Sequence, residues 1–316
     1  MSGHIRRRGE QSWELKFDIG ADPLTGKRAT KYRAFKGTKK EAQAELVRLI
    51  NSAHQGDYVD PSKTTLSEFL DRWLRDWAAV SVGPKTRERY EELIDCHVRP
   101  YIGAVPIQKL QAVHLAELYA RLLREGSKQR GLNTITSLSP RTVGHVHRAV
   151  HKALKVGVEW GVIQRNVAPV ARPPKVAGAE LEILTEEQAQ TLLQKIKGQP
   201  LYPVVMLGLA TGMRRGELLA LRWRDCDLDG GRLCVERSLE RTKSGLRFKA
   251  PKTKHGRRTI SLPASVVAGL RTHWRQQQEQ RFRLGLGKAP EDVLVSRNGT
   301  VRLGFQPPPA PNGREP

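Results

Sequence analysis

The sequence has few cysteines and no long hydrophobic run. Its three cysteines, Cys96, Cys226 and Cys234, have neither the pairing of a disulfide framework nor the spacing of a zinc site. The longest apolar-rich stretch, residues 201–210, is about half the length of a membrane-spanning helix. The opening residues are charged and lack the apolar segment of a signal peptide. We therefore expect a cytoplasmic protein that makes no use of a membrane.

Acidic residues are scarce relative to basic ones. The chain has 55 Lys and Arg against 32 Asp and Glu, which gives a formal charge of +23. The excess is spread over the whole chain, so no single basic tail accounts for it. A protein this basic attracts polyanions through its whole field. Double-stranded DNA is the expected partner, although a ribosomal or RNA-binding protein would show a similar total.

Motifs for nucleotides and metals are also missing. The sequence has no Walker phosphate loop, no acidic metal triad and no zinc spacing. Three histidines, His145, His147 and His151, lie close together, but no carboxylate or cysteine ligand accompanies them. Contact with phosphate or plain solvation is the favoured use of these histidines. We expect neither a metal ion nor a cofactor.

The length of 316 residues fits roughly two or three domains. In residues 1–55, three runs alternate apolar with polar side chains, at 3–7, 13–19 and 30–35. Thr38 and Glu41 then have the spacing of a capping box at the start of a helix. This part is predicted to be a three-stranded sheet braced by one helix. A small stabilising sheet with an ordinary charged outer face is the plainer alternative.

Residues 62–170 are predicted to form four or five helices. Phe69, Trp73 and Trp77 have helical spacing, and Ser139 with Pro140 has the pattern of a helix start. A proline-rich linker at 169–178 follows, and Thr185 to Gln188 caps the first helix of a third module, residues 180–300. Residues 301–316 have too few apolar residues to form a helix or join a core, and are expected to be an unstructured tail.

The stretch 210–229 places arginine and glutamate at the start of a helix. Arg214 follows a Thr-Gly turn, and a guanidinium offers two parallel donors to the oxygens of a phosphodiester. Glu217 lies one turn along the same face. These residues are a candidate phosphate site, and the alternative is a charged helix end with a structural Arg–Glu pair.

The stretch 241–258 holds eight basic residues and no acidic one. It lies between two strand-like runs, 232–236 and 258–263, so we expect a hairpin tip or loop. DNA contact is expected from a set of basic side chains in this stretch and on the 140–155 helix: Lys249, Lys254, Arg257, Arg258, Arg148 and Lys152. A merely solvated basic turn is the alternative.

The residues from Thr211 to Asp225 resemble, in order and spacing, the first-arginine box of the tyrosine recombinases, the phage integrase family. Residues 251–260 resemble the hairpin of that family. The resemblance, which covers about residues 3–300, implies that Arg214 is a catalytic arginine and Glu217 its support. It implies that Lys252, or else Lys254, protonates the leaving 5′ oxygen.

The resemblance also implies a multidomain fold that is mainly α with small β parts. Residues 1–55 would be an arm-type DNA-binding domain of three strands and a helix, and residues 62–170 a helical, SAM-like core-binding domain. Residues 180–300 would be a partial α+β catalytic domain. The expected role is DNA integration or excision of a mobile element, with attachment sites as partners.

The nucleophile of this family is a tyrosine well downstream of the arginine box, yet no tyrosine follows Tyr202. Only His255 and His273 follow Arg214, and neither forms the family's His-x-x-Arg box. Arginine and lysine stabilise and protonate but do not attack, so we expect a C-terminally truncated, cleavage-defective recombinase.

A second reading is a non-catalytic protein that occupies attachment sites and competes with a full-length integrase. Self-association, or association with a full-length integrase on DNA, is expected under either reading. A basic transcription regulator or RNA-binding protein unrelated to recombinases would leave the Arg214 box and the lysine hairpin as accidents.

Overall fold

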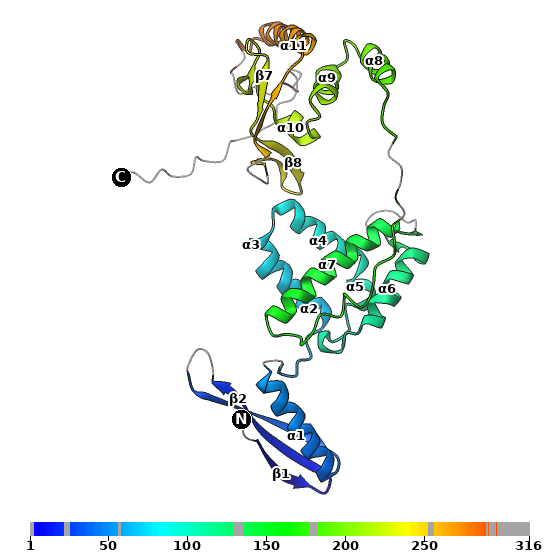
Figure 1. Ribbon diagram of the computed structural model, residues 1–316, viewed down its shortest axis with the longest axis vertical. Coiled ribbons are helices and arrows are strands. Elements are labelled where there is room, and N and C mark those ends of the chain that lie inside the picture. The colour runs from blue at the N-terminus through cyan, green and yellow to red at the C-terminus, as the bar shows by residue number, and fades with distance from the viewer. Residues whose placement is uncertain are drawn as a thin grey trace, which may run out of the picture. The chain divides into compact units, whose positions relative to one another are not determined.

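The structure is a computed structural model that describes residues 3–21, 26–55, 58–128, 135–176, 178, 182–251, 256–288, 290 and 295. The chain divides into two compact units, residues 1–178 and 179–316. Helices dominate and the sheets are small, which confirms the predicted fold class (Figure 1). No helix in the described ranges is long and apolar enough to cross a membrane. The domain limits given above stay predictions, and the tail at 301–316 lies outside the described residues.

The first unit begins with a sheet and a helix. Its elements are β1 (Gly3–Gly9), β2 (Ser12–Ala21), β3 (Arg28–Lys36) and α1 (Lys39–His54). The strands pair antiparallel in the order β1-β2-β3. Leu15 and Phe17 of β2 pack against Leu46 and Leu49 of α1 in a small core. The capping box at Thr38 is confirmed, since its backbone N–H donates to the Glu41 carboxylate at 2.8 Å.

A bundle of helices follows. Its elements are α2 (Leu66–Arg72), the π-helix η1 (Trp73–Ala78), α3 (Ala79–Ser81), α4 (Pro84–His97), α5 (Arg99–Ile102), the 3₁₀ turn η2 (Ile107–Lys109), α6 (Ala112–Glu125), β4 (Ser127–Lys128), β5 (Ile135–Thr136) and α7 (Pro140–Glu159). The predicted start of α7 is confirmed: Ser139 caps it and Pro140 is its first residue. The apolar stripe of α7 is buried in the core of the bundle.

The π-helix was not predicted. Trp73 and Trp77 stack within it, with ring centroids 5.3 Å apart and planes 10° from parallel. Trp73 is fully buried, and Nζ of Lys152 on α7 lies 4.8 Å from the centroid of the Trp77 ring. The apolar spacing assumes an ordinary helical turn, so it indicates a helix without revealing that the turn widens.

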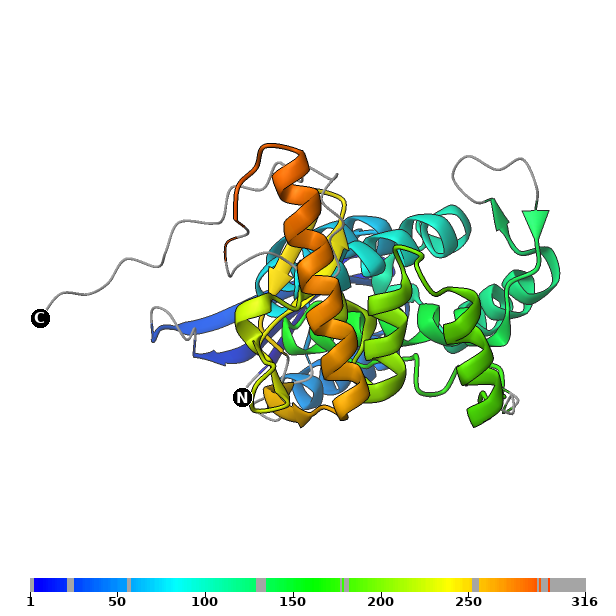
Figure 2. The same cartoon turned by 90° about the horizontal axis from the view of Figure 1, so that it is seen from above.

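The second unit combines helices with two small sheets. Its elements are α8 (Glu186–Lys195), α9 (Tyr202–Thr211), α10 (Arg215–Ala220), the 3₁₀ turn η3 (Trp223–Asp225), β6 (Cys226–Asp227), β7 (Arg232–Val235), β8 (Ser238–Thr242), β9 (Gly245–Lys249), β10 (Arg258–Ser261) and α11 (Ala264–Arg283). Strands pair antiparallel in the order β10-β7-β6, and α11 lies beside α9 (Figures 1 and 2). Leu233 and Val235 of β7 share a core with Val266 and Leu270 of α11.

One prediction in this unit was wrong in part. The stretch 241–258 was expected to be a tip or loop, but β8 and β9 form a two-stranded hairpin over residues 238–249. Leu239 faces Phe248 across the hairpin, and Gly245, with φ of +121°, closes its turn. Arg241 pairs with Leu246 and lies on the same face as Leu239 and Phe248, so a charged residue interrupts the apolar alternation that would predict a strand.

Candidate phosphate-binding site

Arg214 stands at a sharp turn between two helices. Gly212 ends α9 with φ of +61°, a left-handed conformation that glycine adopts without strain. Arg214 follows in extended conformation as the N-cap residue of α10. Its side chain is 78% exposed. The turn therefore presents this guanidinium on the surface of the second unit.

Glu217 binds both the backbone and the guanidinium of Arg214. The Glu217 side chain is only 5% exposed, and its Oε2 accepts a hydrogen bond from the Arg214 backbone N–H at 3.1 Å. Nη1 of Arg214 donates to Oε1 of Glu217 at 3.0 Å. The other two guanidinium nitrogens have no hydrogen-bond partner among the described residues. One nitrogen is thus anchored while two remain available to an oxyanion.

A second arginine reaches the same carboxylate. Arg258, the first residue of β10, donates from Nη2 to Oε2 of Glu217 at 2.9 Å. Burial raises the pKa of Glu217, but the hydrogen bonds from Arg258 and Arg214 outweigh it and lower the pKa to about 2. Glu217 is therefore a carboxylate at neutral pH. Arg258 was predicted only as a DNA contact, and nothing in its local sequence shows that it pairs with a residue 41 positions earlier.

Three lysines of the stretch 241–258 were predicted to have a role: Lys249, Lys252 and Lys254. Lys252 and Lys254 lie outside the described residues, as does His255. Lys249 lies on β9, and its Nζ donates to the carboxylate of Glu240 on β8. Arg257 is exposed, and its nearest carboxylate, that of Glu236, is 3.9 Å away. Arg241, Lys243 and Arg247 on the same stretch are exposed as well.

The basic helix α7 of the first unit carries the other predicted DNA contacts. Arg148 is exposed, and its Nη2 lies 2.7 Å from Nδ1 of His145. The Tyr119 hydroxyl lies 3.0 Å from Nδ1 of His147. Burial and then the charge of Arg148 lower the pKa of His145, so this ring accepts a hydrogen bond as a neutral group. Across the described ranges, no three His, Cys, Asp or Glu side chains come together as metal ligands.

His273 belongs to the core. Its Nε2 donates to the carbonyl of Val295 at 2.8 Å, and burial lowers the pKa of the ring. Trp223, whose indole N–H donates to Gln277 at 2.8 Å, lies beside it. The arrangement is that of a neutral structural histidine.

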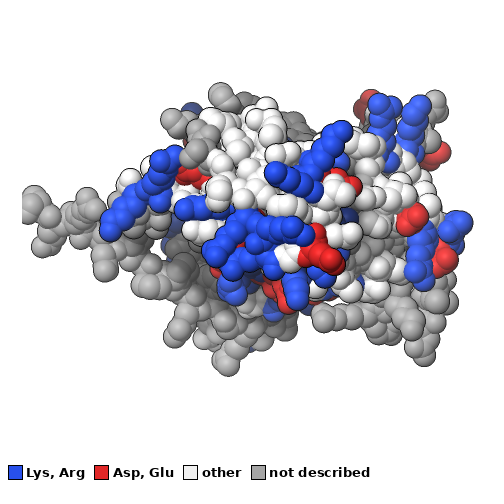
Figure 3. Space-filling view, turned by 90° about the horizontal axis from the view of Figure 1, so that it is seen from below, with Lys and Arg blue, Asp and Glu red and all other residues white. Residues whose placement is uncertain are grey.

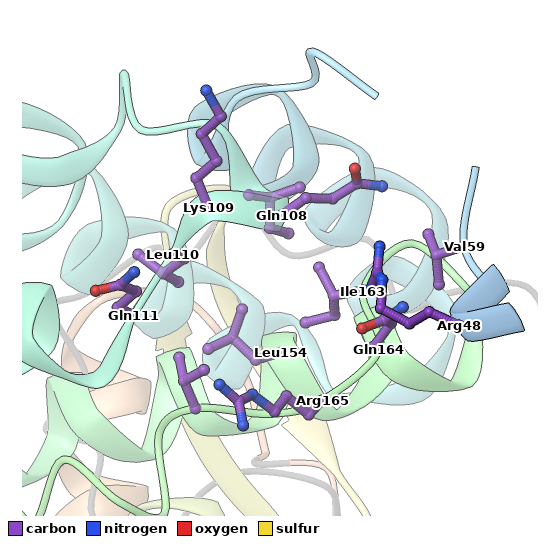
Figure 4. A pocket seen from close by; sticks show the side chains of 12 residues that line it. Arg48, Val59, Gln108, Lys109, Leu110, Gln111, Leu154, Ile163, Gln164 and Arg165 are labelled. Carbon is purple, nitrogen blue, oxygen red and sulfur yellow. The ribbon is translucent and has the colours of Figure 1, made fainter. Parts of the chain in front are cut away.

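A surface cavity of about 450 Å³ lies in the first unit (Figure 4). The charged side chains among its described lining residues are Arg48, Lys109 and Arg165, and none of these lining residues is acidic. The side-chain amide of Gln108 donates a hydrogen bond to the backbone carbonyl of Asp60 at 2.8 Å. Among the described residues that line this cavity, none has a carboxylate, thiol or hydroxyl that could act as an acid, base or nucleophile.

Two family models and a number of known proteins match this chain. A family model described as the phage integrase N-terminal SAM-like domain matches residues 65–123, and one described as the phage integrase family matches residues 182–278. A tyrosine recombinase XerC-like protein of Caldanaerobacter subterraneus subsp. tengcongensis is 25% identical over 299 residues, which are 88% of this chain and 72% of that protein.

Two solved structures share the fold. The Tn1549 transposon integrase, determined in complex with a circular intermediate DNA, matches with a TM-score of 0.55 and 22% identity, over 67% of this chain and 65% of that one. A lambda integrase dimer bound to a COC′ core site matches with a TM-score of 0.50 and 17% identity, over 87% of this chain and 71% of that one. The SAM-like model covers the bundle from α2 into α6, and the second model covers the exposed arginine with its buried glutamate. The chain belongs to the phage integrase family of tyrosine recombinases.

Proposed function

We propose that the chain binds duplex DNA at attachment sites of a mobile element and holds one backbone phosphate at Arg214, as part of site-specific integration or excision. The observation that carries the proposal is the exposed guanidinium fixed at one nitrogen by the buried Glu217. A phosphodiester offers two oxygens in a plane, which a fixed guanidinium meets with parallel hydrogen bonds. Such preorganised donors stabilise charge that develops during phosphoryl transfer.

Basic surfaces elsewhere support the same partner. On the face drawn in Figure 3, Lys and Arg gather in clusters with Asp and Glu beside them. On the outer side of the N-terminal sheet, Lys16 lies opposite Tyr32 and its ammonium lies 5.7 Å from the ring centroid. On α7, Arg148 is exposed and Lys152 is partly so. The DNA-bound relatives support a shared partner, and the lambda integrase dimer supports self-association on DNA.

A polypeptide of these 316 residues is proposed to bind without cleaving. Tyr202, the last tyrosine, is the first residue of α9, and Arg214 follows the other end of that helix. The helix alone separates their backbones by roughly 15 Å, at 1.5 Å per residue. Tyr58, Tyr101 and Tyr119 have hydroxyl groups hydrogen-bonded within the first unit. The second candidate function, proposed for a polypeptide of these residues alone, is non-catalytic competition with a full-length integrase at attachment sites.

DNA binding is tested with a duplex that the wild-type chain enriches from a randomised library. The affinity is expected to fall steeply with salt, since each neutralised phosphate contributes a slope of about −0.9 in log K against log salt. Arg214→Ala is expected to weaken binding by roughly tenfold or more, because a charge-assisted hydrogen bond contributes about 1.5–3 kcal/mol. Arg215→Ala, which removes the exposed neighbouring arginine, is the matched control and has a smaller effect. A flat salt response, or failure to enrich any duplex, contradicts the proposal.

The lysine is tested in a chimera. Residues 1–300 are joined to the C-terminal segment of a tyrosine recombinase that supplies a His-x-x-Arg box and a tyrosine. Cleavage of a nicked duplex is expected in the chimera and not in the 316-residue chain. Lys252→Ala is expected to slow cleavage at a normal 5′ oxygen but to spare a substrate with a better leaving group, which needs no protonation. The same pattern for Lys254→Ala alone assigns the role to Lys254. Mixing the 316-residue chain with a full-length integrase tests competition.

A further inference from the structure

The Glu217 carboxylate joins two arginines from distant parts of the chain. Arg214 precedes α10, and Arg258 begins β10. Both donate to the same carboxylate, at 3.0 Å and 2.9 Å, and Oε2 also accepts the backbone N–H of Arg214. A nearly buried carboxylate with three donors can take few other orientations. Its position therefore sets where the Arg214 guanidinium points.

The backbone beneath Glu217 is fixed by a close helix–strand contact. A Cβ placed on Gly216 would lie 2.5 Å from Oγ of Ser238 and 2.7 Å from the carbonyl oxygen of Leu239, both on β8. Only glycine lets α10 approach the strand this closely. The helix that carries Glu217 is thus seated on the β8–β9 hairpin.

The backbone of Arg258 is fixed independently. Arg258 pairs with Val235 in the β10–β7 ladder, and Val235 is buried in the core of the second unit. The Arg258 side chain is 31% exposed, whereas that of Arg214 is 78% exposed. In sequence it follows the stretch that holds Lys252 and Lys254. Arg258 therefore links a core strand to the base of the candidate phosphate-binding arginine.

We infer that Arg258 is a positioning residue: it holds the Glu217 carboxylate, and through that carboxylate it fixes Arg214 for the DNA phosphate. The inference rests on the proposed function, since it assigns a part in phosphate binding to a residue that was expected to touch DNA itself. With Nη2 donating to Glu217 and Nη1 to the Gly256 carbonyl, Arg258 in this role contributes to DNA affinity only while Arg214 is present to receive the phosphate.

A direct contact and a positioning role differ in how two substitutions combine. If Arg258 contacts DNA, the losses from Arg258→Ala and Arg214→Ala multiply, because separate contacts are additive in free energy. If Arg258 acts through Glu217, then Arg258→Ala should not weaken DNA binding further in a chain that already carries Arg214→Ala. Residues in one hydrogen-bonded network show this kind of coupling.

The experiment measures dissociation constants of the full 316-residue chain for the enriched duplex at fixed salt. The variants are Arg214→Ala, Arg258→Ala, the double variant and Arg257→Ala. Arg258→Ala alone is expected to weaken binding by at least about threefold, and by less than about twofold in the Arg214→Ala background. Arg257→Ala, one charge removed at the adjacent exposed position, is the control and is expected to multiply with Arg214→Ala.

Three outcomes overturn the inference. Losses for Arg258→Ala and Arg214→Ala that multiply make Arg258 a DNA contact. A lowered melting temperature with unchanged affinity makes it a structural residue only. No effect of Arg214→Ala, while the salt response stays steep, refutes the proposed phosphate site and with it the inference that depends on it. If Arg258→Ala does not fold, Arg258→Gln, which keeps one donor near Glu217, takes its place in the cycle with the same criteria.

Discussion

Oε2 of Glu217 accepts a hydrogen bond from Nη2 of Arg258 at 2.9 Å, although 41 positions separate the two residues in the chain. The contact joins the helix α10 to the strand β10 through a carboxylate that water barely reaches. Such a group resists protonation, and its response to acid can be measured.

Glu217→Gln is expected to lower the free energy of unfolding at pH 7. The carboxyl has a pKa of about 2 in the folded chain, against 4.5 for the unperturbed group. Its contribution is fully present above about pH 4.5 and is lost as the pH falls towards 2, because the unfolded state binds the proton first. The loss at pH 7 should be on the order of a few kcal/mol.

Urea unfolding at several pH values between 7 and 3 measures this effect. The difference between wild type and Glu217→Gln should shrink as the pH falls. Glu186→Gln, at an exposed carboxylate in α8, is the control and should stay within about 0.5 kcal/mol of wild type. A difference that is constant with pH would show that the lost packing, and not the charge, is responsible.

Gly216→Ala is expected to destabilise the second unit. The added methyl group meets the Leu239 carbonyl oxygen at 2.7 Å, and backbone in a paired strand cannot move aside cheaply. Overpacking of this kind costs about 1–3 kcal/mol. Thermal unfolding measures it, with Gly208→Ala as control: its Cβ would lie at an ordinary 3.4 Å from Leu218, and alanine favours the helix. Equal stability of the two variants would contradict the close approach.

Two ion pairs of the second unit are expected to contribute very different amounts to the free energy of unfolding. Arg222 and Asp225 are nearly buried, with two hydrogen bonds at 2.7 and 2.8 Å. Asp225→Ala leaves a buried charge without this partner and should cost about 3–5 kcal/mol. Arg232→Ala breaks the exposed pair with Asp227 and should cost less than about 1 kcal/mol. Chemical denaturation of both variants checks the ranking, and a reversed order would refute it.

His97 is expected to make the first unit sensitive to mild acid. It is buried, its Nδ1 has no hydrogen-bond partner within the described ranges, and burial followed by the charge of Arg89 lowers its pKa below 6.5. The unfolded state then takes the proton first, so the free energy of unfolding falls as the pH drops below about 6.5.

His97→Leu should flatten that dependence between pH 7 and 5. It should also raise the free energy of unfolding at pH 7 by roughly 1 kcal/mol, because a buried polar atom without a partner is removed. The control is His54→Leu at an exposed position of α1. An unchanged pH dependence in His97→Leu would assign the acid sensitivity to other groups.

The features that could be predicted from the sequence are contacts between residues a few positions apart. Thr38 with Glu41, and Thr185 with Gln188, form the predicted capping boxes because three residues of spacing decide the contact. The pairing of Arg214 with Glu217 is equally local, and the family resemblance rests on the same short box. The roles of Lys252 and Lys254 stay predictions, because both lie outside the described residues.

The features that escaped prediction depend on distant partners. Arg258 looks like one more basic residue until the β10–β7 ladder brings it to Glu217. The hairpin β8–β9 was hidden because charged side chains interrupt its alternation, and its contact with Gly216 is a tertiary one. The spacing of apolar residues predicts which side chains are buried, but it does not predict which buried surfaces contact one another.

The π-helix at Trp73–Ala78 bears on how this sequence should be aligned with its relatives. A π turn closes its hydrogen bond over five residues and an α turn over four, so each π turn accommodates an additional residue without breaking the helix. A relative whose helix is α throughout would reach the same end point with a shorter segment. In an alignment with such a relative, a gap opened between Trp73 and Ala78 keeps the flanking helical positions, Phe69 and Ala79, in register.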